Sequence, residues 1–391
     1  MHILQVSPYY PPTWSYGGIP RIVCGLSEAL VEQGHQVSVL TTDVLDAKHR
    51  HQLPKIRVEH GVRIYTLDNW SNRLAYHQQL FLPQYSRDIL DNIATFDVIH
   101  LHGHRHLLNN LVLRWTKNTI PYVFTANGTL ERYEQKQWLK VFWDRWISGK
   151  IPLEADACIA VSDHDLRSHL AWGIAKHKLH TIANGLQLSE FTPKTVCAKN
   201  WKQALSSPTH NISNIIVYLG RISPRKGVDH LVRAFQQGNF QDTALVIAGN
   251  DMGGLSTAQK LATHPNIHFV GTLSGEERVE LLQQADVLVY ASQNEIFGLV
   301  PFEGILAGVP VIVSDDCGCG EVVSKAGAGL LVQYGNIEDL IAKLRSILYN
   351  PSMKRSMVER GRKYIQEHLD FSMIAKQHVA VYEHVLREHR N

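Results

Sequence analysis

Short runs of hydrophobic residues alternate along this chain with longer segments whose hydrophobic residues recur at helical spacing. Several short runs are continuous in valine, isoleucine and leucine, which is typical of parallel strands covered on both faces. The expected strands span 2–6, 36–41, 62–66, 97–101, 121–125 and 156–161, then 214–219, 243–248, 266–270, 286–290, 309–313 and 329–332. The expected helices span 19–34, 80–94, 133–150, 228–237, 276–284 and 336–348, and only long helices follow residue 350.

This alternation predicts an α/β protein with two doubly wound, Rossmann-like domains that face each other across a cleft. The polar segment 185–212 has no convincing strand, so we place the domains at 1–185 and 186–371. The terminal helix 372–391 has no sheet of its own, and we expect it to dock on the first domain. Because ligands of such sheets bind beyond the carboxyl ends of the strands, the cleft is the expected active site.

Composition narrows the class of protein. A chain of 391 residues suits two domains, and 44% hydrophobic residues leave enough for two cores. The net charge of +3 and the lack of a block of lysine and arginine argue against a nucleic-acid partner. Five cysteines without a Cys-x-x-Cys motif indicate a reduced, cytoplasmic chain. The N-terminal residues do not resemble a signal peptide, and no hydrophobic run is long enough to span a membrane.

Two glutamates, Glu295 and Glu303, flank a glycine in the segment Glu-Ile-Phe-Gly-Leu-Val-Pro-Phe-Glu. With the first in a loop and the second in the first turns of a helix, both side chains can point into one cleft. Gly298 lets backbone N–H groups approach a ligand, and a helix start favours an anion. Free amides beside two carboxylates suit a phosphate that carries a polyol, which indicates a nucleotide-sugar. The alternative interpretation is a capping box with a salt bridge.

Two cations follow the expected strand 214–219. Arg221 and Lys226 lie in a loop that we expect at the edge of the cleft. Arginine offers a forked donor for phosphate and lysine adds a point charge, so the pair suits a diphosphate. The alternative interpretation is a solvated surface loop.

Gly17 and Gly18 precede the expected helix at residue 19. Glycines at this position permit close approach of the backbone to a bound group, although a plain turn explains them equally well. The segment is not Gly-x-Gly-x-x-Gly, and no acidic residue follows at the spacing that a dinucleotide requires, so a dehydrogenase is disfavoured.

Two further segments raise the question of a metal ion. Alternate histidines can share one face of a strand and bind metal, line a polar cleft, or belong to an ordinary loop. They are His100, His102, His104 and His106. The segment Asp163-His164-Asp165 resembles a clamp for a metal diphosphate, but it follows Ser162 where a helix needs an N-cap. We favour the cap and expect no required metal.

The segment 130–150 combines five lysines and arginines with five aromatic residues, including Trp138, Phe142 and Trp146. A basic, aromatic helix can rest on a membrane surface. The alternative, which we favour, is that the tryptophan face packs inside the first domain and the charges remain in water.

These motifs resemble family 4 retaining glycosyltransferases of the GT-B fold, including bacterial glucosyltransferases of surface-polysaccharide pathways. The resemblance covers essentially the whole chain and also uses Asn184-Gly185. It implies that Arg221 and Lys226 bind the diphosphate of the donor, Glu303 the ribose, and Glu295 the hydroxyls of the transferred sugar. The resemblance further implies that the backbone of Phe297, Gly298, Leu299 and Val300 covers phosphate and sugar, and that Gly17 and Gly18 complete the phosphate site.

The chain departs from this family at Asn127, where many relatives carry a histidine near the reacting centre. Asparagine cannot take a proton at neutral pH. Three explanations follow: the histidine is not a base, His102 or His104 replaces it, or this chain is impaired. We favour the first, in which the departing phosphate accepts the proton, and we keep Asn127 with Glu295, Arg221 and Lys226 as the candidate catalytic residues.

We therefore expect a cytoplasmic, metal-independent retaining hexosyltransferase without a cofactor other than its nucleotide-sugar, UDP-glucose first. The acceptor would be a saccharide or a lipid-linked saccharide. Contact with the inner face of a membrane through 130–150 is the alternative to the packing of that segment. Two alternatives are a GT-B enzyme of another reaction class, such as a phosphorylase or an epimerase, and a non-catalytic subunit that binds nucleotide-sugar.

Overall fold

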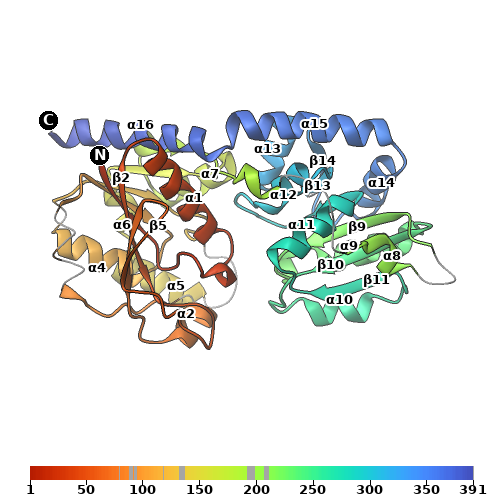
Figure 1. Cartoon of the computed structure of the whole chain (residues 1–391), viewed down its shortest axis with the longest axis horizontal. Helices are drawn as coiled ribbons and strands as arrows, with labels where there is room; N and C mark the ends of the chain where they lie inside the picture. The colour runs from red at the N-terminus through yellow and green to blue at the C-terminus, as the bar shows by residue number, and fades with distance from the viewer. Residues whose placement is uncertain are drawn as a thin grey trace. The chain divides into compact units, whose positions relative to one another are not determined.

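The structure is a computed structural model, and it describes residues 1–78, 80–87, 91, 95–117, 119–131, 137–191, 199–206 and 211–390. The chain forms two compact units (Figure 1). The first comprises 1–186 and 369–391, and the second comprises 187–368. The boundaries expected from the sequence, 185/186 and 371/372, differ from these by one and by three residues.

The first unit is built on an eight-stranded sheet in the order β3-β4-β2-β1-β5-β6-β7-β8. Each neighbouring pair is parallel except β3 and β4, which are antiparallel. Its strands are β1 (His2–Val6), β2 (Gln36–Thr42), β3 (Ile56–Glu59), β4 (Val62–Leu67), β5 (Val98–His102), β6 (Tyr122–Thr125), β7 (Ala157–Ala160) and β8 (Leu179–Thr181). The chain order reverses between β1 and β5, which is where a doubly wound sheet presents a ligand site.

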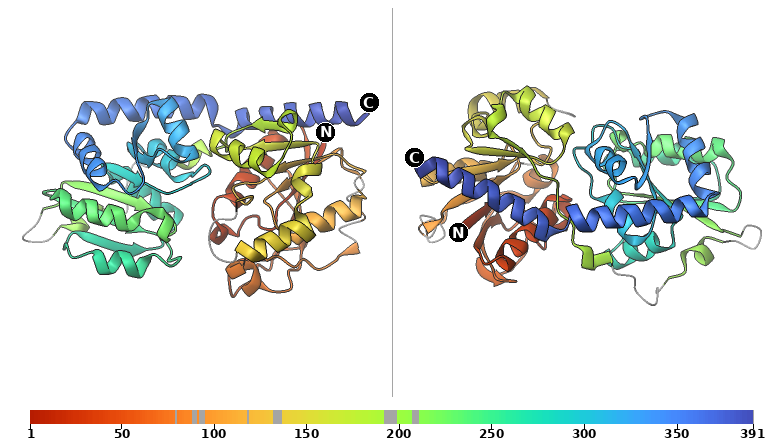
Figure 2. Two further views of the ribbon diagram at one scale, coloured as in Figure 1. Left: turned by 180° about the vertical axis from the view of Figure 1, so that it is seen from behind. Right: turned by 90° about the horizontal axis from the view of Figure 1, so that it is seen from above.

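Helices cover both faces of this sheet (Figures 1 and 2). The described α-helices are α1 (Ile19–Glu32), α2 (Asn72–Gln78), α4 (Leu107–Thr116), α5 (Gln137–Trp143), α6 (Ile151–Glu154), α7 (Asp163–Trp172) and α16 (Phe371–Arg390). A π-helical turn, Asp144–Ser148, follows α5, and short 3₁₀ turns span Trp14–Tyr16 and Lys176–Lys178.

The last helix of the chain, α16, completes the core of the first unit. It packs against α1, and the two are seen side by side in blue and red in Figure 2. Phe371 enters where two glycines make room: a Cβ atom at Gly25 would lie 2.1 Å from its ring, and one at Gly185 would lie 2.3 Å from it. The Asn184-Gly185 motif therefore has a packing role, because any larger residue at 185 would displace the start of α16.

The second unit contains a six-stranded, fully parallel sheet in the order β11-β10-β9-β12-β13-β14. Its strands are β9 (Asn214–Leu219), β10 (Thr243–Ala248), β11 (Ile267–Gly271), β12 (Val287–Tyr290), β13 (Val311–Ser314) and β14 (Gly329–Val332). Its helices are α8 (Trp201–Leu205), α9 (Val228–Gly238), α10 (Leu255–Leu261), α11 (Gly275–Gln284), α12 (Val300–Ala307), α13 (Gly318–Ala326), α14 (Ile337–Leu348) and α15 (Pro351–His368), with 3₁₀ turns at Leu188–Phe191 and Pro224–Lys226. The order reverses between β9 and β12.

The predicted class of two doubly wound α/β domains is confirmed, and every expected strand range contains a strand. The helix expected over 80–94 is wrong for residues 80–86, which are not helical and contain Pro83, and much of the remainder lies outside the described residues. Residues 133–136 of the helix expected over 133–150, and part of the segment 185–212, also lie outside them.

Candidate functional site

The switch point of the second sheet brings together residues from two neighbouring strands. Strand β9 ends at Leu219 and is followed by Arg221 and the 3₁₀ turn that contains Lys226. The adjacent strand β12 ends at Tyr290, and the loop after it carries Glu295. Parallel strands present their carboxyl ends at one edge, which explains why residues about 70 positions apart meet here.

Lys226, Tyr290 and Glu295 form a closed set of contacts. The Lys226 ammonium donates to the Tyr290 hydroxyl at 2.9 Å and to Glu295 Oε2. The Tyr290 hydroxyl donates to the same carboxylate oxygen at 2.9 Å. Only 13% of the Lys226 side chain and 21% of the Glu295 side chain are exposed, so the ion pair is mostly buried but is still accessible to water.

The electrostatics of this cluster keep Glu295 charged. Burial acts to raise the pKa of Glu295, but the charge and hydrogen bond of Lys226 outweigh it and hold the pKa below its ordinary value. Burial beside that carboxylate raises the pKa of Tyr290 well above its ordinary range, so the phenol remains a donor. The pair can therefore offer a carboxylate acceptor and an ammonium donor to one ligand.

Backbone contacts fix the two loops relative to each other. The amide of Gln293 donates to the Arg225 carbonyl at 2.8 Å, and the Gly318 amide donates to the Glu295 carbonyl at 2.8 Å. Gly227 has φ of 65°, and a Cβ atom there would lie 2.3 Å from the Ala291 carbonyl oxygen. Only glycine fits this approach, so the Lys-Gly pair holds the loop that carries Lys226 against the loop that carries Glu295.

Arg221 lies next to this cluster and is an exposed residue. Its carbonyl accepts a hydrogen bond from the Tyr218 hydroxyl at 2.8 Å, which fixes its backbone. No hydrogen bond or ion pair of its side chain is found within the described part of the chain. Arg221 nevertheless acts electrostatically on Glu295, whose pKa it helps to lower. It is a cation near the pair that is available to an anion.

Glu303 occupies a separate place, in the first turns of α12. Its side chain is 6% exposed, and its two oxygens accept from Arg278 Nη1 at 3.1 and 3.0 Å. Arg278 comes from α11, and its guanidinium lies 5.7 Å from the centre of the Phe191 ring. Sequence reasoning missed Arg278, because no motif connects a residue on one helix with a glutamate 25 positions later.

The loop that enters α12 combines a buried ring with a close approach. Phe297 is 3% exposed, and its ring centre lies 5.2 Å from that of Phe302. A Cβ atom at Gly298, which has φ of 70°, would lie 3.1 Å from Glu295 Cγ. Leu299 is the N-cap residue of α12 and Val300 its first residue, and no side chain caps this end. Their amides belong to the set that a helix start leaves without intrahelical acceptors.

In the first unit, Gly17 and Gly18 lie where the sequence places them. Gly17 has φ of 99° and Gly18 is the N-cap residue of α1, which begins at Ile19. Asn127 follows β6 with φ of 51°, and both atoms of its amide are buried without a hydrogen-bond partner in the described residues.

The four histidines of 100–106 have different surroundings. His100 and His102 belong to a buried hydrogen-bond network with Tyr382 and Gln5, and His104 donates to a buried carboxylate at 3.0 Å. His106 packs against two aromatic rings. Within the described ranges, no group of three or more histidine, cysteine, aspartate and glutamate side chains is arranged to hold a metal ion.

The cap predicted before Asp163 is confirmed. Ser162 accepts a hydrogen bond from the Asp165 amide at the start of α7, and the Asp165 carboxylate accepts from the Val161 amide at 2.9 Å. Both acidic residues lie in the first turn, where they favour the helix dipole.

The packing that we favoured for the aromatic segment 130–150 is wrong for Trp138 and Trp146, whereas Trp143 is half-buried and its Nε1 atom is buried. Trp138 is 71% exposed and Trp146 is 70% exposed. We call Trp138, Val141, Phe142 and Trp146 the aromatic face, since all four are exposed. Contacts from the opposite, polar side of the segment hold these helices against the rest of the first unit.

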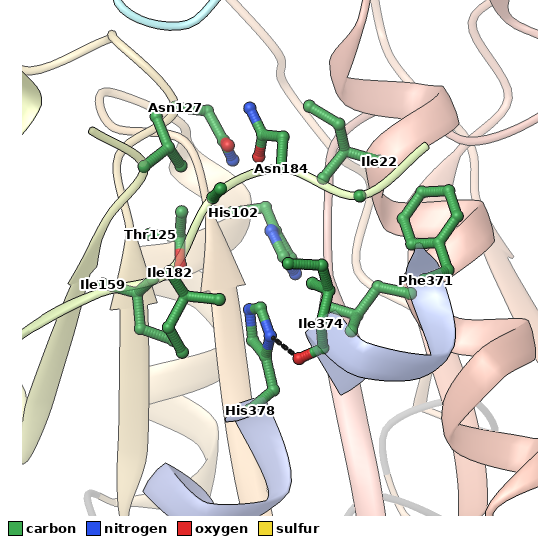
Figure 3. A pocket seen from close by; sticks show the side chains of 14 residues that line it. Ile22, His102, Thr125, Asn127, Ile159, Ile182, Asn184, Phe371, Ile374 and His378 are labelled. Carbon is green, nitrogen blue, oxygen red and sulfur yellow. Dashed lines mark hydrogen bonds between the residues drawn. The ribbon is translucent and has the colours of Figure 1, made fainter. Parts of the chain in front are cut away.

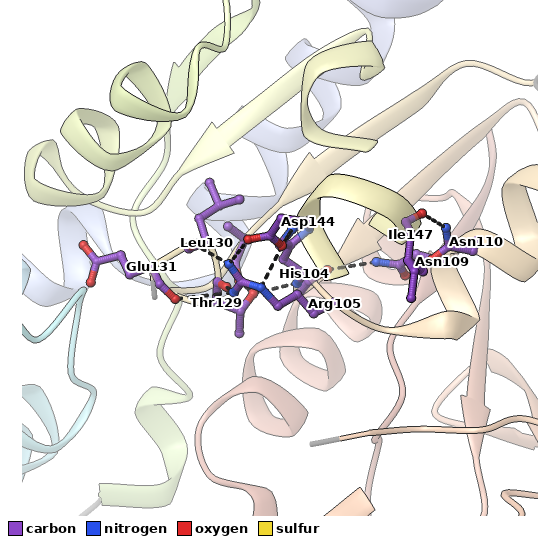
Figure 4. A network of polar contacts seen from close by, with 11 residues as sticks. His104, Arg105, Asn109, Asn110, Thr129, Leu130, Glu131, Asp144 and Ile147 are labelled. Carbon is purple, nitrogen blue, oxygen red and sulfur yellow. Dashed lines mark hydrogen bonds and ion pairs between the residues drawn. The ribbon is translucent and has the colours of Figure 1, made fainter. Parts of the chain in front are cut away.

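That polar anchor is Asp144, which is 8% exposed (Figure 4). Its carboxylate accepts from Arg105 Nε and Nη2, both at 2.8 Å, and from His104 Nε2 at 3.0 Å. Asn110 donates to the Ile147 carbonyl at 2.7 Å. These contacts use the polar side of the segment and leave the aromatic face to solvent.

Two family models match this chain. Residues 16–190 match the family model described as Glycosyltransferase Family 4, and residues 200–364 match the model described as Glycosyl transferases group 1. The chain belongs to the family 4 glycosyltransferases. It is 25% identical to an uncharacterized glycosyltransferase of Methanocaldococcus jannaschii over 98% of each chain. It is 26% identical to a glycogen synthase of Mycobacterium tuberculosis over 98% of this chain and 94% of that protein.

Solved structures show that this glycosyltransferase has the GT-B fold. A sucrose-phosphate synthase from Thermosynechococcus elongatus superposes with a TM-score of 0.74 at 22% identity, over 99% of both chains. The Anabaena protein HepE, solved with UDP and glucose, gives a TM-score of 0.71 at 17% identity over 98% of this chain and all of that one. Among the described residues of the glycosyltransferase, no helix combines the length and hydrophobicity needed to cross a membrane.

Proposed function

We propose that this glycosyltransferase is a retaining, metal-independent hexosyltransferase that moves a hexose from a nucleotide-sugar to a hydroxyl of a saccharide or lipid-linked saccharide. The observation that carries the proposal is the cluster of Lys226, Tyr290 and Glu295 beside the exposed Arg221 at the switch point of the second sheet. HepE, which has the same fold, was solved with UDP-glucose, and this supports UDP-glucose as the first donor to test. A role in polysaccharide synthesis is part of the same proposal.

We assign the diphosphate to Arg221 and Lys226. The Lys226 ammonium has three N–H donors and uses two on Tyr290 and Glu295, so one remains for a phosphate oxygen. The Arg221 side chain adds a fork of donors. When the bond from the sugar C1 to the diphosphate breaks, negative charge builds on the leaving phosphate, and these cations stabilise that charge.

We assign the sugar hydroxyls to Glu295 and the ribose to Glu303. Arg278 donates to both oxygens of Glu303 and holds this carboxylate at the start of α12, and carboxylate oxygens are the acceptors that the vicinal hydroxyls of a ribose need. The backbone of Phe297, Gly298, Leu299 and Val300 is proposed to cover phosphate and sugar at the start of α12.

Proton transfer is assigned to the donor itself. Asn127 cannot act as a base, and burial lowers the pKa of His102 to about 3, so neither suits a base at neutral pH. We therefore assign the proton of the attacking hydroxyl to the leaving phosphate, which fits transfer with retention.

The test is a screen for nucleoside diphosphate release from UDP-, GDP- and ADP-glucose in the presence of EDTA and a panel of saccharides. We expect one donor to be consumed and Lys226→Ala to lower its turnover by about 10²–10³-fold, since one donor to developing charge contributes about that much. Lys343→Ala, which removes a similar pair with Asp339 on α14, is the control and retains activity.

The same screen separates the alternatives. Release of sugar phosphate from a glycan and inorganic phosphate would identify a phosphorylase, and interconversion of free nucleotide-sugars would identify an epimerase. Binding of UDP without release from any donor, over hours and with every acceptor, would identify a non-catalytic subunit. Each result would replace the transferase proposal.

We also propose that the aromatic face rests on a membrane that carries a lipid-linked acceptor. Its four exposed apolar side chains are accompanied by the exposed cations Arg145 and Lys150. Apolar side chains beside basic ones suit an interface with anionic lipid.

A further inference from the structure

A small pocket lies in the first unit at the carboxyl ends of β5, β6 and β7 (Figure 3). Its walls are mostly apolar and include Ile22, Ile159 and Ile374. About 10 Å³ is available to the centre of a water molecule, which is room for about one such molecule. Such an edge of a doubly wound sheet is where ligands bind.

A chain of buried hydrogen bonds begins and ends at this pocket. His102 Nε2 lies 2.6 Å from Gln5 Oε1, and Gln5 Nε2 donates to the Tyr382 hydroxyl at 3.3 Å. That hydroxyl lies 2.7 Å from His100 Nδ1, and His100 Nε2 lies 2.7 Å from Thr125 Oγ1. His102 and Thr125, the two ends, both line the pocket.

The chemistry of the members fixes the bond directions at His102 and Gln5, and we assign the tautomer of His100 so that the buried Tyr382 O–H has an acceptor. Burial lowers the pKa of His102 to about 3 and holds that of His100 well below its ordinary value, so each ring is neutral with one N–H. Gln5 Oε1 only accepts, so His102 Nε2 carries the hydrogen. Tyr382 accepts from Gln5 and donates to His100 Nδ1. His100 Nε2 then donates to Thr125.

Both ends of the chain are consequently unsatisfied. His102 Nδ1 is a bare acceptor on a side chain that is 1% exposed, and it has no partner in the described part of the protein. With this tautomer of His100, Thr125 Oγ1 accepts from His100 Nε2, and its own O–H then has no acceptor among the described residues. An acceptor without a donor and a donor without an acceptor therefore lie on one cavity.

Two amides border the same cavity. Both amide atoms of Asn127 are buried without a partner in the described ranges, and Asn184 is 7% exposed. Figure 3 shows Asn127 and Asn184 next to each other, near His102. Apolar walls with a few converging polar groups are typical of a ligand site.

We propose that this pocket is a binding site for one hydroxyl oxygen, which donates to His102 Nδ1 and accepts from Thr125 Oγ1. The oxygen closes the hydrogen-bond chain into a ring that includes Tyr382 of α16. A water molecule and a saccharide hydroxyl share this chemistry. The proposal does not depend on the donor site of the second unit or on turnover.

The first test is a crystal structure of the full-length protein, grown without polyols, at a resolution that shows other buried waters. We expect density within hydrogen-bond distance of His102 Nδ1 and Thr125 Oγ1. After soaking with glucose, replacement of that density by a sugar hydroxyl identifies a saccharide as the occupant, and unchanged density identifies water. An empty pocket in both crystals would overturn the proposal.

Matched variants at Thr125 separate the site from general packing. Thr125→Ser retains the hydroxyl and keeps the density, whereas Thr125→Val has nearly the same shape, lacks the donor and loses it. Density of equal occupancy in Thr125→Val contradicts the assignment.

Imidazole ¹⁵N spectra provide a second readout in solution. The signals of His102, identified by their loss in His102→Gln, are expected to show the Nε2–H form with an acceptor at Nδ1. A hydrogen on Nδ1 would reverse the bond chain and refute the site.

Discussion

The Lys226 ammonium binds two side chains of its own unit, Tyr290 and Glu295, and these contacts determine the expected effect of changing Glu295. Glu295→Gln removes the charge but keeps the size, so Lys226 becomes more available to a diphosphate. We expect UDP affinity to be retained and turnover to fall about 10- to 100-fold, as for loss of a hydrogen bond to a charged group worth about 1.5–3 kcal/mol. Steady-state UDP release and calorimetric UDP binding check this. Glu367→Gln, on an exposed position of α15, is the control, and equal losses of affinity and turnover in Glu295→Gln would refute the assigned sugar contact.

Glu303 and Arg278 allow a second prediction at the scale of single residues. Arg278→Met leaves a carboxylate that is 6% exposed without its cation, and we expect a loss of about 3–5 kcal/mol in the free energy of unfolding. The double variant Arg278→Met with Glu303→Gln removes the uncompensated charge and is expected to recover part of that loss. Urea unfolding measures both, and a double variant less stable than Arg278→Met would contradict the ion pair's importance.

The motif residues and their partners differ in how far sequence predicts them. Glu295, Glu303, Arg221 and Lys226 are recognisable because they lie at strand ends and at a helix start. Arg278 is not, because its contact depends on how two helices pack, and nothing in its neighbours indicates that contact. The exposure of Trp138 could not be predicted either, because periodicity identifies an apolar face but does not show whether another element covers it.

At the scale of elements, strand β5 and helix α16 together bury several histidines. Burial lowers the pKa of His102 to about 3 and that of His378 to about 4. The unfolded chain binds these protons below about pH 6.5 and the native state does not, so stability is lost as the pH falls from about 6.5 towards 4. Each buried histidine contributes a slope of about 1.4 kcal/mol per pH unit.

Thermal unfolding between pH 7.5 and 4.5 tests this slope. His378→Phe removes one titrating group from the core, and we expect its stability to fall less steeply with acid than that of the wild type. His177→Phe, at an exposed position, should retain the wild-type slope. Parallel curves for His378→Phe and the wild type would show that this ring titrates equally in both states.

The sequence predicts correctly those strands that are buried on both faces of their sheet. Strands such as β9 and β10 are buried along almost their whole length, and their continuous runs gave the correct ranges. Strand β3 was not predicted because it is an antiparallel edge strand, in which Ile56 is 49% exposed and Val58 is 62% exposed. Short helices such as α10, α12 and α13 also fell outside the expected ranges, since one or two turns show too little periodicity.

On the scale of the whole molecule, the aromatic face predicts binding to anionic vesicles. We expect sedimentation with such vesicles at low salt and release as salt rises, because each basic residue near the surface contributes about 1 kcal/mol. Trp138→Ser with Trp146→Ser should reduce the bound fraction several-fold. Tyr349→Ser, which changes an aromatic residue that is 60% exposed in the second unit, should leave it unchanged. No sedimentation of the wild type at low salt would remove the membrane proposal.

The two glycines that receive Phe371 have a consequence for biosynthesis. The sheet and α1 of the first unit are made early, but the ring that fills the gap between Gly25 and Gly185 belongs to α16, which is made only after the whole second unit. At roughly 5–20 residues per second, the nascent first unit waits on the order of ten to forty seconds for its closing helix. During that interval the second unit can finish folding, while the incomplete first unit exposes the apolar gap between Gly25 and Gly185. Chaperones would have to cover this gap.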